Sequence, residues 1–268
     1  MDHYIYSQRL LGLYKGIRKL SDINVYLALA LAIFILIAGP TLFILSNFTN
    51  SLGLMFQNFI HMSFYTDPNG GSGFPQMWTV FYWAWFAATA PFIGLFVARI
   101  SRGRSIRQLI LSILLWGTVG SWIYFAVFGG YAIHLETNNV LSLTNILAND
   151  GEQAVIVELL RSLPISTIVM IFFVVLAFIF LATSLDSASY VLASIATKEL
   201  KDEEEPARWH RVVWGFILSI LAISLISVGA LRVVQTSAVI VAVPVVVLYL
   251  LFTISLIRSL KKDFPKGG

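Results

Sequence analysis

The chain alternates long apolar stretches with short polar segments. Six stretches are apolar over the roughly 20 residues that a helix needs to cross the hydrocarbon core of a bilayer. They are residues 24–46, 76–98, 108–133, 165–194, 212–230 and 234–257. Because such continuous runs replace the alternating patterns of a soluble core, the sequence predicts an all-α integral membrane protein with six transmembrane helices.

The composition supports the same fold class. The chain is 58% hydrophobic and 12% charged, with a mean hydropathy of +0.82, whereas soluble domains are about 45–50% apolar and about 25% charged. Cysteine is absent, which excludes disulfides, thiolate metal sites and cysteine nucleophiles. We therefore expect one membrane domain over residues 24–257.

The basic residues predict the orientation of the spans. Sixteen of the 18 Lys and Arg residues lie in alternate segments, four in each of 1–23, 99–107, 195–211 and 258–268, and only Arg161 and Arg232 lie in the other three. Positive charge near span ends stays on the cytoplasmic side. The segment 1–23 and the short tail 258–268 are thus expected in the cytoplasm, in a plasma or inner membrane, and the basic excess does not indicate nucleic-acid binding.

The external segments contain further helical patterns. Between the first two spans, apolar residues recur at helical spacing and predict an amphipathic helix at about 47–64 in the outer interface. These residues are Phe48, Leu52, Met55, Phe56, Phe59 and Ile60. The segment 134–164 is expected to hold a short helix around 150–162.

The second span is rich in large aromatic side chains, which an interfacial aromatic belt explains only for its outermost turn. Trp83, Trp85 and Phe86 are expected to lie deeper. Because aromatic faces attract cations, these residues are candidates for a wall that binds a quaternary ammonium group. Packing in a helix bundle is the alternative for any one of them.

Pro91, in the same span, has no N–H and frees a carbonyl one turn earlier, near Ala87. Transporters use broken helices at membrane depth to bind substrates. The alternative is a simple kink.

The fourth span carries Phe180, Thr183, Ser184 and Ser187 at i, i+3, i+4 and i+7, which places them on one helical face. Neutral hydroxyl oxygens suit a monovalent cation such as Na⁺, although hydrogen bonds between helices are an alternative use. Asp186 lies beside them and requires a partner if it is within the hydrocarbon; we expect it to act as a cap or gate.

No pattern indicates an enzyme or a metal site. The four histidines, His3, His61, His134 and His210, are scattered, and no H-E-x-x-H pair, G-x-S-x-G sequence or phosphate-binding glycine loop is present. We expect no cofactor apart from a coupling ion.

The run from Trp78 to Trp85, continued by Pro91-Phe92-Ile93-Gly94 and by Ala98 to Arg104, resembles the signature of the betaine/choline/carnitine transporter family. Gly39-Pro40-Thr41 and the segment Ala182 to Ser189 extend the resemblance over nearly the whole chain. It implies a leucine-transporter-like fold of twelve helices, of which this chain resembles helices seven to twelve. They comprise the second inverted repeat and one preceding helix, so the first repeat would be supplied in cis or by a separate chain.

The resemblance also implies functional residues and partners. The aromatic box falls on Trp85, Phe86 and Thr89, where the family has tryptophan at the last two positions. The implied sodium sites fall on Phe180, Thr183 and Ser184 and on Phe92, and the implied gating arginines are Arg99 and Arg104. A homotrimer in lipid is expected.

The function implied is secondary transport of compatible solutes such as glycine betaine, choline or carnitine, in osmoprotection, by symport with Na⁺ or H⁺ and alternating access. Two alternatives remain open. The half-chain acts only as an assembly subunit, or Phe86 and Thr89 adapt the site to a different small solute.

Overall fold

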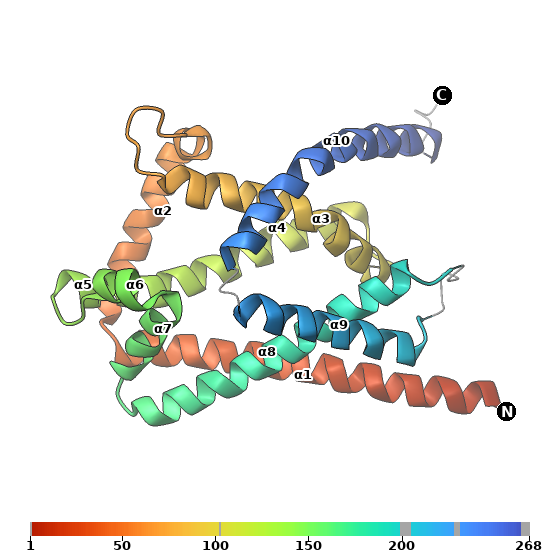
Figure 1. Ribbon diagram of the computed structural model, residues 1–268, viewed down its shortest axis with the longest axis horizontal. Helices are drawn as coiled ribbons and strands as arrows, with labels where there is room; N and C mark the ends of the chain where they lie inside the picture. The colour runs from red at the N-terminus through yellow and green to blue at the C-terminus, as the bar shows by residue number, and fades with distance from the viewer. Residues whose placement is uncertain (1, 102, 199–204, 228–230, 264–268) are drawn as a thin grey trace. The chain divides into compact units, whose positions relative to one another are not determined.

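The computed structural model describes residues 2–101, 103–198, 205–227 and 231–263. Every regular element in these ranges is a helix (Figure 1). The elements are α1 (Asp2–Ala38), α2 (Thr41–Phe64), the π-helical turn η1 (Gln76–Val80), α3 (Phe81–Ile100), α4 (Ile106–Tyr124), the π-helical turn η2 (Phe125–Gly129), α5 (Gly130–Thr137), α6 (Leu143–Asp150), α7 (Glu152–Arg161), α8 (Ser166–Ile195), α9 (Arg208–Ser227) and α10 (Leu231–Asp263).

Six helical stretches among the described residues are long and apolar enough to cross a membrane. They are Lys19–Ala38, Gln76–Ala98, Ile106–Thr137, Ser166–Ile195, Arg208–Ser227 and Val233–Asp263. The predicted all-α membrane architecture with six spans is therefore confirmed. Residues 258–263 of the expected tail continue α10, and residues 264–268 lie outside the described ranges.

The first helix ends earlier than residue 46, the boundary that the apolar run suggests. Pro40 has no N–H, and its ring would clash with the carbonyl of Leu36 in a continuous helix. That carbonyl accepts a hydrogen bond from Thr41 Oγ1 at 2.6 Å, and Gly39 N donates to Ile35 O at 2.8 Å. The chain turns at Gly39-Pro40, and the amphipathic helix expected at 47–64 is the later part of the longer α2.

Contacts divide the chain into two compact units. The first comprises Met1–Phe59 and Gly103–Ser187. Its core is an apolar cluster in which Ile35 and Ile44 are almost fully buried, and Tyr131 and Leu160 pack with them. The Tyr131 hydroxyl lies 2.9 Å from Ser162 Oγ, so the segment that follows α7 is joined to α5 by a hydrogen bond. The short helix expected around 150–162 corresponds to α7.

The second unit comprises Ile60–Arg102 and Ala188–Gly268. In it α3 and α10 lie against one another (Figure 1). Ser189, near the end of α8, is buried, and its hydroxyl would lie 3.4 Å from a Cβ placed on Gly215 of α9. The small residue at position 215 therefore lets α9 approach α8 closely.

Candidate functional site

The aromatic residues that open the second span form a chain of ring contacts. The Trp78 and Tyr82 rings are stacked with centroids 6.0 Å apart, and the Phe81 and Trp85 rings lie 5.7 Å apart. The run starts in the π-helical turn η1 and continues into the regular helix α3. These contacts lie along one helix and keep neighbouring rings in fixed relative orientations.

Three of the predicted solute-binding residues share one face of α3. At about 100° per residue, Trp85, Phe86 and Thr89 fall within about 100° of the helix circumference. Trp85 is 37% exposed and Phe86 63% exposed. Trp83, at 67% exposed, lies about 120° from Thr89, at the margin of this face. We call Trp85, Phe86 and Thr89 the aromatic face.

The opposite face of α3 consists of small residues. Ala84, Ala87, Ala88 and Pro91 follow the spacing i, i+3, i+4 and i+7, and all four are half-buried. The packing partner is α10, from which the Tyr249 hydroxyl donates a hydrogen bond to the Ala87 carbonyl at 2.6 Å. The contact with α10 therefore leaves the aromatic face open.

Pro91 does not break its helix. The helix α3 is continuous from Phe81 to Ile100 with Pro91 inside it, so the unwound segment considered from the sequence is not formed. The carbonyl that Pro91 leaves unpaired is indeed that of Ala87, and Tyr249 supplies its hydrogen-bond donor. The sequence alone gave no sign of Tyr249, because the pairing depends on how α10 packs.

Thr89 is half-buried, and its hydroxyl donates to the carbonyl of Trp85 at 2.8 Å. This local bond uses the only hydrogen that the hydroxyl can donate, while its oxygen can still accept. At this position the aromatic face thus presents a methyl group and an acceptor oxygen in place of an indole ring.

The hydroxyl residues of α8 lie as predicted on one side of that helix. Phe180 is 60% exposed, Ser184 is exposed and Thr183 is half-buried. The Thr183 hydroxyl donates to the carbonyls of Phe180 and Ile179, at 3.0 and 3.1 Å, and Ser187 Oγ donates to Thr183 O at 2.9 Å. In these bonds the hydroxyls donate their hydrogens, so the lone pairs of their oxygens remain available to a cation.

The other predicted residues are placed as follows. Phe92 of α3 is half-buried, and Asp186 of α8 is half-buried and lies about 120° away from Phe180. Arg104 is exposed in the turn before α4, next to Ser105, which forms a capping box with Gln108. The side chain of Arg99 lies outside the described part of the structure.

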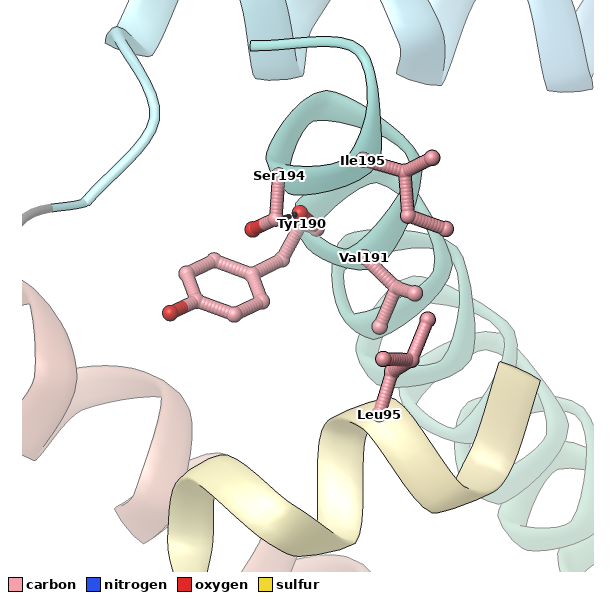
Figure 2. Close-up of a pocket in the computed structure, with 5 residues that line it drawn as sticks. All are labelled: Leu95, Tyr190, Val191, Ser194 and Ile195. Carbon is pink, nitrogen blue, oxygen red and sulfur yellow. Dashed lines mark hydrogen bonds between the residues drawn. The ribbon is translucent and has the colours of Figure 1, made fainter. Parts of the chain in front are cut away.

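A pocket of about 150 Å³ lies between α3 and α8 within the second unit (Figure 2). It is lined by Leu95, Tyr190, Val191, Ser194 and Ile195. The Ser194 hydroxyl donates to Tyr190 O at 2.8 Å, and Arg211 of α9 lies 5.4 Å from the Tyr190 ring centroid. None of the predicted site residues lines this pocket. Among the described residues, no group of three or more His, Asp or Glu side chains is placed to hold a metal ion.

These features define a polytopic membrane protein whose spans carry an exposed aromatic face on one helix and a row of hydroxyls on another. A family model for betaine/carnitine/choline transporters matches residues 4–265, and the chain belongs to this family. It is 35% identical over 255 residues to the uncharacterized transporter YeaV of Escherichia coli K12. The match covers 95% of the chain and 53% of that protein, so the chain spans about half the length of this relative.

Proposed function

We propose that the chain forms half of a secondary transporter for quaternary ammonium solutes, working by alternating access in the plasma membrane with both ends of the chain in the cytoplasm. The missing first repeat would be supplied in cis or by a separate chain. The observation that carries the proposal is the exposed aromatic face of α3, which the packing of α10 leaves uncovered. Membership of the family supports the solute class.

A trimethylammonium group has no hydrogen to donate, so hydrogen-bond acceptors do not select for it. An aromatic ring attracts such a cation through the electron density of its face, most strongly where water is excluded. Trp85 supplies the stronger π-face and Phe86 a weaker one. Trp83, at the margin of the aromatic face, is expected to close the site from the side.

The driving ion is proposed to bind at Thr183 and Ser184 of α8, with Phe180 one turn away and Phe92 near a second ion position. Neutral hydroxyl oxygens are suitable ligands for Na⁺. The Thr183 hydroxyl donates its hydrogen to backbone carbonyls, so its oxygen can still accept. Symport with Na⁺ is therefore favoured over symport with H⁺, because neither hydroxyl titrates in the physiological range. Arg99, Arg104 and Asp186 are proposed to act in gating.

A second candidate is transport of a smaller or more polar solute, and Thr89 favours it. This residue places an acceptor oxygen where the family typically has an indole ring, and its proton is held by Trp85 O at 2.8 Å. A solute that donates one hydrogen bond would fit this arrangement, whereas a quaternary ammonium group would leave the oxygen unused.

We further propose assembly as a homotrimer through the external part of α2. Phe56 is 66% exposed, Phe59 57% and Ile60 69%, which is apolar surface that a subunit contact or lipid must cover. Cross-linking in mild detergent is expected to give trimers. Monomers alone would contradict this assembly and leave the surface to lipid.

Uptake of labelled glycine betaine, choline and carnitine into proteoliposomes, with and without a Na⁺ gradient, tests the function. Two preparations are compared, the chain alone and the chain together with the first repeat of a family member. Na⁺-driven uptake by the second preparation but not by the first supports a half-transporter. No uptake of these solutes by either preparation would refute transport of quaternary ammonium compounds and leave the smaller-solute and assembly-subunit alternatives.

A further inference from the structure

At Pro91 the helix α3 lacks one backbone hydrogen bond, and no N–H of the same helix replaces the missing donor. A proline inside a helix cannot donate to the carbonyl four residues earlier, which here is that of Ala87. In the hydrocarbon no water replaces the missing donor, so an unpaired carbonyl there carries a free-energy cost that hydration would offset in water. The helix nevertheless continues to Ile100.

The donor comes from a residue far away in the sequence. The Tyr249 hydroxyl of α10 lies 2.6 Å from the Ala87 carbonyl oxygen, and Tyr249 is half-buried against α3. Both helices belong to the second compact unit. A single side chain therefore satisfies the one carbonyl of α3 that Pro91 leaves without a partner.

Ala87 lies between Phe86 and Thr89 in sequence, on the side of α3 opposite the aromatic face. A bond at this carbonyl fixes how α3 is rotated about its axis and how far it bends at Pro91. Both quantities determine where the Trp85 and Phe86 rings point. We propose that Tyr249 is a positioning residue for solute binding, which holds the aromatic face in its binding orientation through the carbonyl freed by Pro91.

This inference rests on the proposed transport function, and Tyr249→Phe tests it in the complete transporter, by which we mean the chain together with a first repeat. The substitution keeps the ring and removes only the hydroxyl. Loss of one hydrogen bond is expected to raise the KM for the solute by about two- to tenfold, with a smaller change in maximal rate. Tyr26→Phe is the matched control, since Tyr26 is 71% exposed in α1, and it should leave KM unchanged.

The decisive variant combines Tyr249→Phe with Pro91→Ala. An alanine at position 91 restores the N–H that a regular helix donates to the Ala87 carbonyl, so the tyrosine hydroxyl is no longer needed. In the Pro91→Ala background, Tyr249→Phe should change KM less than twofold. A direct contact of the Tyr249 hydroxyl with the solute would raise KM equally in both backgrounds, and a packing role of the ring alone would leave KM unchanged in both. Either result would overturn the proposal.

A spectroscopic readout tests the bond without any transport. Ala87-Ala88 is the one Ala-Ala pair in the sequence, so alanine labelled with ¹³C at the carbonyl and ¹⁵N at the amide gives one directly bonded ¹³C–¹⁵N pair in the 268-residue chain. Solid-state NMR of the chain in bilayers should show this carbonyl shifting upfield in Tyr249→Phe and returning in the double variant.

Each negative result has its own meaning. An unshifted carbonyl in Tyr249→Phe would overturn the bond itself. A shifted carbonyl with unchanged KM, in a protein that transports, would overturn the positioning role. Absence of uptake by the unmodified complete transporter would instead refute the proposed function, and the carbonyl signal would still report whether the bond exists.

Discussion

Replacing Thr89 by tryptophan changes the one position of the aromatic face that lacks an aromatic ring. Thr89 shares the face with Trp85 and Phe86, whose rings are 37% and 63% exposed, so an indole at position 89 has an open side. The substitution removes the hydrogen bond from Thr89 Oγ1 to Trp85 O. The helical N–H of residue 89 still pairs with that carbonyl, so the loss is small.

The gain follows from the attraction between a cation and an aromatic face, which is about 0.5–2 kcal/mol depending on how dry the site is. At about 1.4 kcal/mol per factor of ten, Thr89→Trp should tighten glycine betaine binding by about two- to thirtyfold. Equilibrium binding and uptake at saturating Na⁺ measure this change. The Na⁺ dependence should not change, because no hydroxyl of α8 is altered.

Ala98→Trp is the matched control. Ala98 is exposed in the same helix and lies about 180° from Thr89, so its indole should not affect binding. If the site accepts a smaller solute, Thr89→Trp should fill it and abolish that solute's transport. Unaltered uptake of every solute would show that position 89 does not line the site, and the reasoning would be refuted.

Three further predictions concern the proposed ion site, a helix junction and the loop of residues 65–72. Replacing Thr183 and Ser184 together by alanine should raise the Na⁺ concentration needed for half-maximal uptake at least tenfold, since two oxygen ligands are lost; unchanged Na⁺ dependence would assign both hydroxyls to packing. Gly39→Ala should destabilise the protein by about 1–3 kcal/mol in thermal unfolding, because its Cβ would lie 2.7 Å from Ile35 O and 3.2 Å from the Tyr131 ring, whereas Gly53→Ala, with no atom within 4 Å, should be neutral or stabilising. The pKa of Asp67 is lowered, chiefly by the hydrogen bond from the Ser72 hydroxyl, so the loop order it provides should persist above the ordinary aspartate pKa and be lost as the pH falls through the lowered value. Hydrogen exchange of residues 65–72, corrected for intrinsic rates, should show this loss in the unmodified protein and none in Asp67→Asn, which should exchange fast at every pH.

The spans could be predicted because hydrocarbon imposes a length and a composition that are visible in one sequence. The predicted end of the first span at residue 46 was wrong for a specific reason. Leu42, Ile44 and Leu45 are apolar, so hydropathy continues across Gly39-Pro40 although the helix does not. A proline after a glycine was the available signal for the end of α1 at Ala38.

Pro91, unlike Pro40, does not end its helix. A proline by itself does not distinguish the two cases, since Pro40 and Pro91 both free a carbonyl four residues earlier. At Pro40 the chain turns and Thr41 Oγ1 binds Leu36 O. At Pro91 the donor is on α10, and the pairing depends on tertiary packing.

The common face of the hydroxyl residues on α8, by contrast, followed from helical spacing, whereas Thr89 was indicated by the resemblance to the family. Phe180, Thr183 and Ser184 required only the periodicity of α8 to be placed on one face. The separation of the aromatic face from the small residues of α3 required knowledge of which side α10 covers. Tyr249 has no neighbour in sequence that would have indicated its role.

The bond between Tyr249 and Ala87 has an evolutionary consequence. A descendant that loses the proline at position 91 regains the amide that the helix lacks, and selection on the hydroxyl at position 249 then relaxes. A descendant that loses the hydroxyl first carries an orphaned carbonyl until position 91 also changes. The order of the two substitutions is therefore constrained, and in a lineage where both have changed, position 91 is expected to have changed first.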